Sequence, residues 1–182
     1  MTPTNPAGSS SGTGGADVTI RPARDGDVPV VLAMFDSAVA WLAARGRTGQ
    51  WGTRPFTGDA RRTEQVASWL DGGGMRIAEH DGQAAGCISV GPAHDYVTPA
   101  GEPELYVQAL VTDRRHAGHH VGAVLLDWAA AEARARRVGL LRVDCYAGDD
   151  GRLVAYYESR GFTRVAPFTV GQWPGMLLQR RP

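Results

Sequence analysis

The chain contains no lysine, and each of its 19 basic side chains is an arginine. This absence excludes enzymes that need a lysine nucleophile or a lysine Schiff base, including those that attach pyridoxal phosphate, and it excludes the Ser-Lys dyad. It also excludes the Walker-type phosphate loop, whose lysine contacts the bound phosphates. Any chemistry must therefore come from other side chains and from the backbone.

Cysteine and an excess of charge of one sign are also lacking. Two cysteines, Cys87 and Cys145, are too few for a disulfide framework, and a reduced cytoplasmic compartment is the simplest interpretation. The 19 basic and 19 acidic residues give a formal net charge of zero, which offers no general attraction to nucleic acid or to an anionic membrane. No apolar run reaches the length of a membrane span, and the start lacks a signal-peptide pattern. We therefore expect neither a nucleic-acid nor a membrane partner.

A length of 182 residues with 43% apolar residues is typical of one globular domain. Residues 1–16 are small and polar and show no hydrophobic periodicity. Such a segment cannot bury enough apolar surface to fold. We expect residues 1–16 to form a disordered N-terminal tail and residues 17–182 to form the domain.

Hydrophobic periodicity and turn residues predict the order β-α-α-β-β-β-α-β-α-β-β. The predicted strands cover residues 18–21, 75–79, 84–90, 104–112, 140–145, 162–170 and 176–179. The predicted helices cover residues 28–42, 59–70, 121–137 and 152–160, and residues 171–175 form the last turn. The middle of the chain has hairpin signals and the later part has β-α-β crossovers. This order indicates an α/β (α+β) fold, a mixed sheet with helices packed on it.

The most informative segment is a strand, a short loop and a helix around residues 110–126. The loop carries Gly118, and Gly122 lies in the first turn of the helix. The first N–H groups of a helix have no partner within it, and the helix dipole adds partial positive charge there. Glycines allow an anion to approach the backbone closely, so this segment is suited to bind a pyrophosphate. Four side chains are placed to add contacts: Arg114, Arg115, His119 and His120.

Two segments carry a family signature. Residues 111–126 are similar to the motif (Arg/Gln)-x-x-Gly-x-(Gly/Ala). Residues 150–162, Asp-Gly-Arg-Leu-Val-Ala-Tyr-Tyr-Glu-Ser-Arg-Gly-Phe, are similar to Asn-x-x-Ala-x-x-x-Tyr-Glu-x-x-Gly-Phe. Residues 18–23, followed by Asp27, are similar to the usual opening of the same family. From Val18 to the C-terminus the chain thus resembles the GNAT superfamily of acyl-CoA N-acyltransferases.

The chain departs from this pattern at three positions. Ala117 stands at the usual Arg/Gln position, which removes a side chain and keeps the backbone N–H. His120 stands at the first motif glycine, so its side chain must point away from the pyrophosphate or donate to it. Asp150 replaces the usual Asn, and its charge is a less favourable neighbour for an anionic carrier.

The resemblance implies a single-domain GNAT fold, with a mixed twisted sheet of about six or seven strands flanked by about four helices. It implies acetyl-CoA as the co-substrate, with no metal. The implied reaction moves an acetyl group to a primary amine of a small molecule or peptide by direct attack, in a monomer or homodimer. The alternative from another class is a non-catalytic module that binds acyl-CoA as a sensor or regulator.

The resemblance also implies roles for individual residues. A backbone N–H near residues 110–112 polarises the thioester carbonyl, and the pantetheine arm pairs with the same strand edge. Tyr157 protonates the departing thiolate, since a phenol has a pKa near 10. The implied cofactor-binding residues are Leu110, Val111, Thr112, Ala117, Gly118, His119, His120, Val121, Gly122, Ala123, Asp150 and Tyr157.

The general base stays open at this level. Glu104 and Gln108 share one strand face by the period of two, and only Glu104 can act as a base. His94 and Asp95 in the preceding loop are alternatives, as is a water molecule. We expect the substrate pocket to form from residues 45–57 and 91–103. The candidate substrate contacts are Trp51, Asp95, Tyr96 and Gln108, with Trp41 and Phe56 nearby.

Three other interpretations are set aside. His116, His119 and His120 suggest a zinc site, but no Glu or Cys lies at ligand spacing, so we expect no metal. Cys145 lies on a predicted core strand, where a cysteine behaves as a small hydrophobe. A dinucleotide fold is excluded because the chain lacks Gly-x-Gly-x-x-Gly after a strand.

Overall fold

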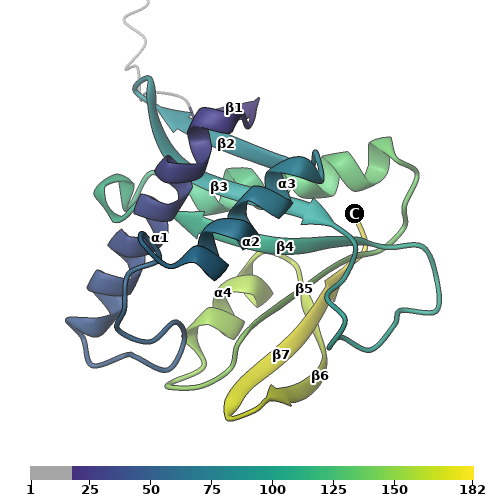
Figure 1. Ribbon diagram of the computed structural model, residues 1–182. Coiled ribbons are helices and arrows are strands. Elements are labelled where there is room, and N and C mark those ends of the chain that lie inside the picture. Colours follow the sequence, from purple (N-terminus) through teal and green to yellow (C-terminus); the bar gives the residue numbers. More distant parts are fainter. Residues whose placement is uncertain (1–17) are drawn as a thin grey trace, which may run out of the picture.

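The computed structural model describes residues 18–182, so the predicted tail lies outside the described residues. Seven strands and four helices follow in the predicted order (Figure 1). The strands are β1 (Thr19–Pro22), β2 (Met75–His80), β3 (Gln83–Gly91), β4 (Leu105–Thr112), β5 (Leu141–Tyr146), β6 (Thr163–Val170) and β7 (Trp173–Arg180). The helices are α1 (Val28–Ala43), α2 (Ala60–Asp71), α3 (Val121–Ala135) and α4 (Arg152–Ser159), and the short 3-10 turns are η1 (Asp25–Asp27) and η2 (Arg114–His116).

The strands form one sheet in the order β1-β2-β3-β4-β5-β7-β6. β4 and β5 run parallel, and the other neighbours are antiparallel. Helices α1 and α2 cover one face, called here the α1 face, and α3 and α4 cover the other, called the α3 face (Figure 1). This arrangement confirms the predicted mixed sheet with flanking helices.

Helix α1 packs on the sheet through an apolar stripe. Pro29 is tolerated because it lies in the first turn, where its missing N–H has no helical acceptor. Val31 and Phe35 on this stripe are buried against Ile77 and Phe56. The segment Asp25–Ala43 is long and apolar enough to cross a membrane by length and composition alone, which corrects the expectation that no segment reaches that length.

The sheet opens between β4 and β5. Their pairing covers only residues 105–107 of β4 and 141–143 of β5. On the other side of β4, the register with β3 shifts so that Gln108 is an extra residue without a partner, which is a β-bulge. A bulge bends its strand and increases the local twist, so residues 108–112 of β4 diverge from β5. The edge of residues 110–112 that faces β5 is therefore unpaired, at the place where the resemblance puts the pantetheine arm.

Two predicted boundaries were wrong. Strand β7 begins at Trp173 instead of residue 176, because a turn of only Gly171 and Gln172 joins it to β6. Pro174 lies inside this strand, and its carbonyl accepts a hydrogen bond from the Ala147 N–H at 2.9 Å. Helix α3 ends at Ala135 instead of residue 137, because Arg137 adopts a left-handed conformation with φ 57°.

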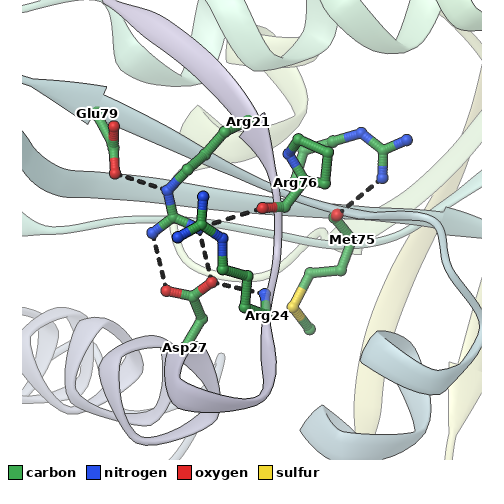
Figure 2. Close-up of polar contacts among 7 residues, drawn as sticks. Arg21, Arg24, Asp27, Met75, Arg76 and Glu79 are labelled. Carbon is green, nitrogen blue, oxygen red and sulfur yellow. Dashed lines mark hydrogen bonds and ion pairs between the residues drawn. The ribbon is translucent and has the colours of Figure 1, made fainter.

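A charged network ties the start of the domain together (Figure 2). Arg21 of β1 donates to both carboxylate oxygens of Asp27, at 2.7 and 2.9 Å, and to Glu79 of β2 at 2.6 Å. Asp27 also accepts from the Arg24 N–H at 2.7 Å. Its hydrogen bonds with Arg21, more than the Arg24 contact, lower the pKa of Asp27 below its usual 3.8. The buried Asp27 carboxylate therefore links β1, η1 and, through Arg21, β2.

We expect Asp27→Asn to lower the free energy of unfolding by about 2 kcal/mol, because charged hydrogen bonds are lost. Since the folded pKa of Asp27 is depressed, its contribution is complete above pH 3.8 and is lost as the pH falls through the folded pKa. Urea unfolding at neutral and acidic pH measures both effects. The exposed neighbour Asp25, changed to Asn, is the control, and equal stability of the two variants at neutral pH would contradict the prediction.

Candidate functional site

A cleft of about 970 Å³ occupies the gap between β4 and β5. On the α3 face it is lined by the start of α3, by α4, and by Val143 and Cys145 of β5. On the α1 face it is lined by α1, by residues of the α1–α2 loop, and by His94, Tyr96 and Asp144. The cleft therefore passes through the sheet and is open to two different sets of side chains.

The start of α3 presents unpaired backbone donors to this cleft. The N–H groups of Gly118, His120, Val121 and Gly122 donate to no described residue. All four residues line the cleft. Because the helix dipole also places partial positive charge here, the segment is suited to an anion such as a pyrophosphate.

The backbone explains how His120 replaces a motif glycine. His120 caps α3 in the left-handed region, with φ 55° and ψ 21°, a conformation that glycine adopts easily. A histidine keeps the same backbone at a cost of about 1 kcal/mol. At Gly122 the close contact is different, since a Cβ there would lie 2.6 Å from the Tyr156 hydroxyl of α4 and would displace the end of that side chain. The departure at His120 thus preserves the helix start.

Ten of the twelve residues predicted to bind the cofactor line the cleft, and two do not. The ten are Leu110, Val111, Thr112, Ala117, Gly118, His120, Val121, Gly122, Ala123 and Tyr157. His119 instead lies against the buried His80 ring, with ring centroids 4.0 Å apart. The Asp150 carboxylate pairs with Arg47 at 3.2 Å and with Arg152 at 2.5 Å. These two arginines neutralise the charge that replaces the family's usual Asn.

Tyr157 of α4 lies at the α3 face of the gap. Its side chain is 5% exposed and packs edge-on against Phe162 and Tyr156. Among residues 18–182, no group hydrogen bonds to its hydroxyl. Burial raises the pKa of Tyr157 well above 10, so the phenol is protonated at neutral pH. Burial likewise raises the pKa of the neighbouring Cys145 to about 12, so that thiol is not ionised.

Glu104 lies away from the cleft, contrary to its candidate role as the base. Its carboxylate accepts from Arg142 at 3.1 and 3.2 Å, and Arg142 is only 3% exposed. Arg142 also donates to the Thr98 carbonyl at 2.7 Å. Glu104 precedes the part of β4 that still pairs with β5, so it sits at the closed end of the gap. Glu104 therefore forms an ion pair with the buried Arg142.

Three of the four candidate substrate residues line the cleft, and one does not. Trp51, Tyr96 and Gln108 line the cleft, whereas Asp95 is exposed and does not. Both ends of the Gln108 amide are already engaged, its oxygen by Ser89 at 3.1 Å and its nitrogen by the Pro92 carbonyl at 3.0 Å. Gln108 thus fixes the bulge at the gap.

Arg114, predicted to add a contact to the pyrophosphate, lines the cleft, whereas one carboxylate and two other arginines there are not predicted from the sequence. Asp144 is the only acidic residue among the cleft's described lining residues, which also include Arg62, Arg114 and Arg160. None of these arginines forms an ion pair with a described carboxylate, and the buried Arg114 Nε has no hydrogen-bond partner. The sequence contains a signal that points to Asp144. Arg142 and Asp144 alternate with apolar residues, which indicates that one face of the strand at residues 140–145 is polar, whereas that strand is predicted only to be part of the core.

The α1–α2 loop closes one end of the cleft. The Trp173 indole donates to the Gln50 carbonyl at 3.1 Å, and Arg47 reaches Asp150 beyond β5. Gly49 lies so close to the Tyr146 ring that a Cβ there would overlap it. These contacts join three segments that are far apart in the chain.

The candidate metal ligands do not form a metal site. Within the described part of the chain, no group of three or more His, Cys, Asp or Glu is placed to hold an ion. His80, His116 and His119 are neighbours, with His80 and His116 centroids 5.5 Å apart. They form a packed group of rings beside the loop that precedes α3.

Comparisons with known proteins agree with this architecture. Residues 39–162 match the model of the acetyltransferase (GNAT) family, and no curated protein matches the chain. A GNAT-family acetyltransferase from Listeria monocytogenes is similar in structure, with TM-score 0.69, 21% identity, and coverage of 93% of this chain and 97% of that one. The ribosomal-protein-alanine N-acetyltransferase of Brucella melitensis has TM-score 0.65 and 24% identity over 90% and 99% of the two chains. A putative acetyltransferase from Salmonella typhimurium, solved with acetyl-CoA, has TM-score 0.62 and 22% identity over 90% and 93%.

We expect Gly49→Ala to separate the α1–α2 loop from Tyr146, because the added methyl group overlaps the ring. The free energy of unfolding should fall by about 1–3 kcal/mol, as for other overpacked sites. Trypsin should also cleave faster after Arg47, which lies in this loop and precedes Thr48. Gly26→Ala, at a glycine with no atom near its Cβ position, is the matched control. Unchanged stability together with unchanged cleavage would refute this account of the loop.

Proposed function

This chain belongs to the acetyltransferase (GNAT) family, and from that membership we propose that it moves an acetyl group from acetyl-CoA to a primary amine by direct attack. The observation that carries the proposal is the set of unpaired N–H groups at the start of α3, which lie at the same cleft as an unpaired edge of β4. The N–H groups suit the diphosphate of acetyl-CoA, and the β4 edge suits its amide-containing pantetheine arm.

The charges of the cleft support a polyanionic ligand. Its described lining holds three arginines and one carboxylate, so the excess charge is positive. Arg114 is stacked on Trp41 with 3.9 Å between the guanidinium carbon and the ring centroid, and burial lowers its pKa. A partly buried guanidinium without a counter-ion gains when an anion binds. Arg47 and Arg152 also neutralise Asp150 near the same cleft.

The residues present fit acetyl-CoA, which would supply an activated thioester carbonyl. The N–H groups of Gly118, His120, Val121 and Gly122 would hold the diphosphate. The unpaired edge of residues 110–112 would hydrogen bond the pantetheine arm as a neighbouring strand does, and a backbone N–H there would polarise the carbonyl oxygen.

Tyr157 Oη is the proton donor that we propose for the departing sulfur. The phenol lines the gap, has no hydrogen-bond partner among the described residues, and stays protonated because burial raises its pKa. A donor with a high pKa matches a thiolate, which is itself a fairly strong base. Glu104 has no part in this scheme, and water in the open cleft would carry the proton released by the amine.

We propose a small-molecule or peptide amine as the substrate, rather than nucleic acid or a membrane. A cytoplasmic monomer or homodimer would agree with two buried, unpaired cysteines among the described residues. The alternative is a module that binds acyl-CoA without turnover. Release of free thiol from acetyl-CoA with a panel of primary amines separates the two, since tight binding without any release would favour the module.

We expect Tyr157→Phe to lower kcat about 100-fold or more, the usual contribution of a general acid. Acetyl-CoA binding should stay within twofold, because the lost hydroxyl has no protein partner to disturb. Thiol release measures kcat and calorimetry measures binding. Tyr156→Phe, which removes the neighbouring phenol of the same helix, is the comparison. A Tyr157→Phe enzyme with normal kcat would eliminate Tyr157 as the acid.

We expect Gly118→Val to weaken acetyl-CoA binding about 10-fold or more. Gly118 has φ 93°, which a β-branched residue adopts only with strain, so the donors beside it must move. Calorimetric titration with acetyl-CoA gives the affinity. Gly101→Val is the matched control, because Gly101 has φ 75° and open space in a loop outside the cleft. Equal affinity in the two variants would count against the α3 site.

A further inference from the structure

Asp144 is a carboxylate without a cation in the middle of the cleft. It lies on β5 at the gap, between Val143 and Cys145, which pack in the core on the α3 face. Because side chains alternate along a strand, Asp144 points to the α1 face. No described arginine or histidine forms an ion pair with it, although both buried carboxylates of residues 18–182, Asp27 and Asp113, lie beside arginines.

Two phenols hold this carboxylate in place. The Tyr106 hydroxyl donates to Oδ1 at 2.5 Å, and the Tyr96 hydroxyl donates to Oδ2 at 3.4 Å. Burial, followed by the charge of Asp144, raises the pKa of both phenols, so they remain donors. His94 is stacked on Tyr96, with centroids 5.1 Å apart, and meets Tyr106 edge-on. The carboxylate is therefore oriented by two phenols and forms no ion pair with a described side chain.

Aromatic rings continue from this point along the cleft. Tyr96 is stacked on Phe168 at 5.8 Å, Phe168 lies 6.2 Å from Trp173, and Trp173 lies 5.8 Å from Tyr146. Of these rings, Tyr96, Trp173 and Tyr146 line the cleft. Aromatic faces attract organic cations and also cover apolar groups. A partly buried carboxylate beside such rings favours a ligand that is cationic at one end and apolar beyond it.

The position of Asp144 is suited to the acceptor side of the reaction. Tyr157 packs with Val143 and Cys145 on the α3 face, whereas Asp144 faces the α1 face, so the two flank β5 at the gap. The unpaired N–H groups and the proposed proton donor thus occupy one side. The carboxylate and the aromatic rings occupy the other.

We propose that Asp144, held by Tyr96 and Tyr106, binds the ammonium group of the substrate and makes the enzyme selective for cationic primary amines on an apolar or aromatic body. The bound ammonium releases one proton to water in the open cleft, and the neutral amine that remains attacks the thioester. This inference rests on the proposed N-acetyltransferase function and assigns its amine subsite. Asp144 contacts the substrate directly, and Tyr96 and Tyr106 are positioning residues. The exposed Asp95, which shares the loop of Tyr96, has no part in the subsite.

The test compares thiol release with 2-phenylethylamine, which is cationic at pH 7.5, and with aniline, which is uncharged there. We expect the wild type to prefer 2-phenylethylamine. Asp144→Asn should lower kcat/KM for this amine about 100-fold through KM, the usual loss when one partner of a buried charge pair is removed. Its kcat/KM for aniline and its acetyl-CoA affinity should stay within threefold. Asp95→Asn, with the same change of charge on the surface, should resemble the wild type.

A second variant protects the test against misfolding. Tyr96 is half exposed, so Tyr96→Phe should leave the fold intact and raise KM for 2-phenylethylamine about fivefold without affecting aniline, because one hydrogen bond to a charged group is lost. A wild type that prefers aniline, or an Asp144→Asn enzyme that keeps its kcat/KM for 2-phenylethylamine, overturns the proposal. An equal loss for both amines also overturns it, since it indicates a structural role.

Failure of the proposed function has a different signature. If the wild type releases no thiol with any amine, the transferase proposal fails first. Calorimetric titration of 2-phenylethylamine then decides the subsite alone, because binding that Asp144→Asn abolishes supports an ammonium site and binding unaffected by that change refutes it.

Discussion

The separation of β4 from β5 is the constraint on which the rest of this protein depends. Unpaired backbone groups in the interior of a sheet are costly unless something else satisfies them. Here the parallel pairing stops after residues 107 and 143, and a cleft of about 970 Å³ begins. The bulge at Gln108 is held by Ser89 on one side and Pro92 on the other, so the divergence belongs to the folded structure. A ligand that pairs with the free edge of β4 supplies the hydrogen bonds that β5 does not make there.

The gap also gives the cleft two chemically different ends. On the α3 face, backbone donors at the start of α3 and Arg160 at the end of α4 provide positive potential. On the α1 face, one carboxylate held by neutral phenols is set among aromatic rings. A phosphorylated carrier and a cationic acceptor can therefore reach the same point from opposite sides without sharing contacts. The difference between the two ends of the cleft follows from the alternation of side chains along β5, which places Val143 and Cys145 on one face and Asp144 on the other.

The departures from the family pattern are compensated by the residues around them. His120 keeps the left-handed backbone of the glycine that it replaces, and Asp150 is neutralised by Arg47 and Arg152. Neither compensation was predictable from the motif. Arg47 is 103 positions from Asp150 in the chain, so only the folded α1–α2 loop brings the two together.

By itself, the sequence determined the order of elements, the mixed sheet and the position of the helix start at residues 118–122. These features depend on local periodicity, on turn residues and on spacing within one short segment, all of which are properties of neighbours in the chain. The tertiary structure alone decided which side chains face the cleft. Glu104 lies outside the cleft because it pairs with Arg142, and His119 lies outside it because it packs on the His80 ring. Asp95 is on an exposed loop outside the cleft, whereas Asp144 lines the cleft because β4 and β5 diverge. Each of these outcomes depends on residues distant in sequence, because charge pairing, ring packing and strand separation are interactions across space.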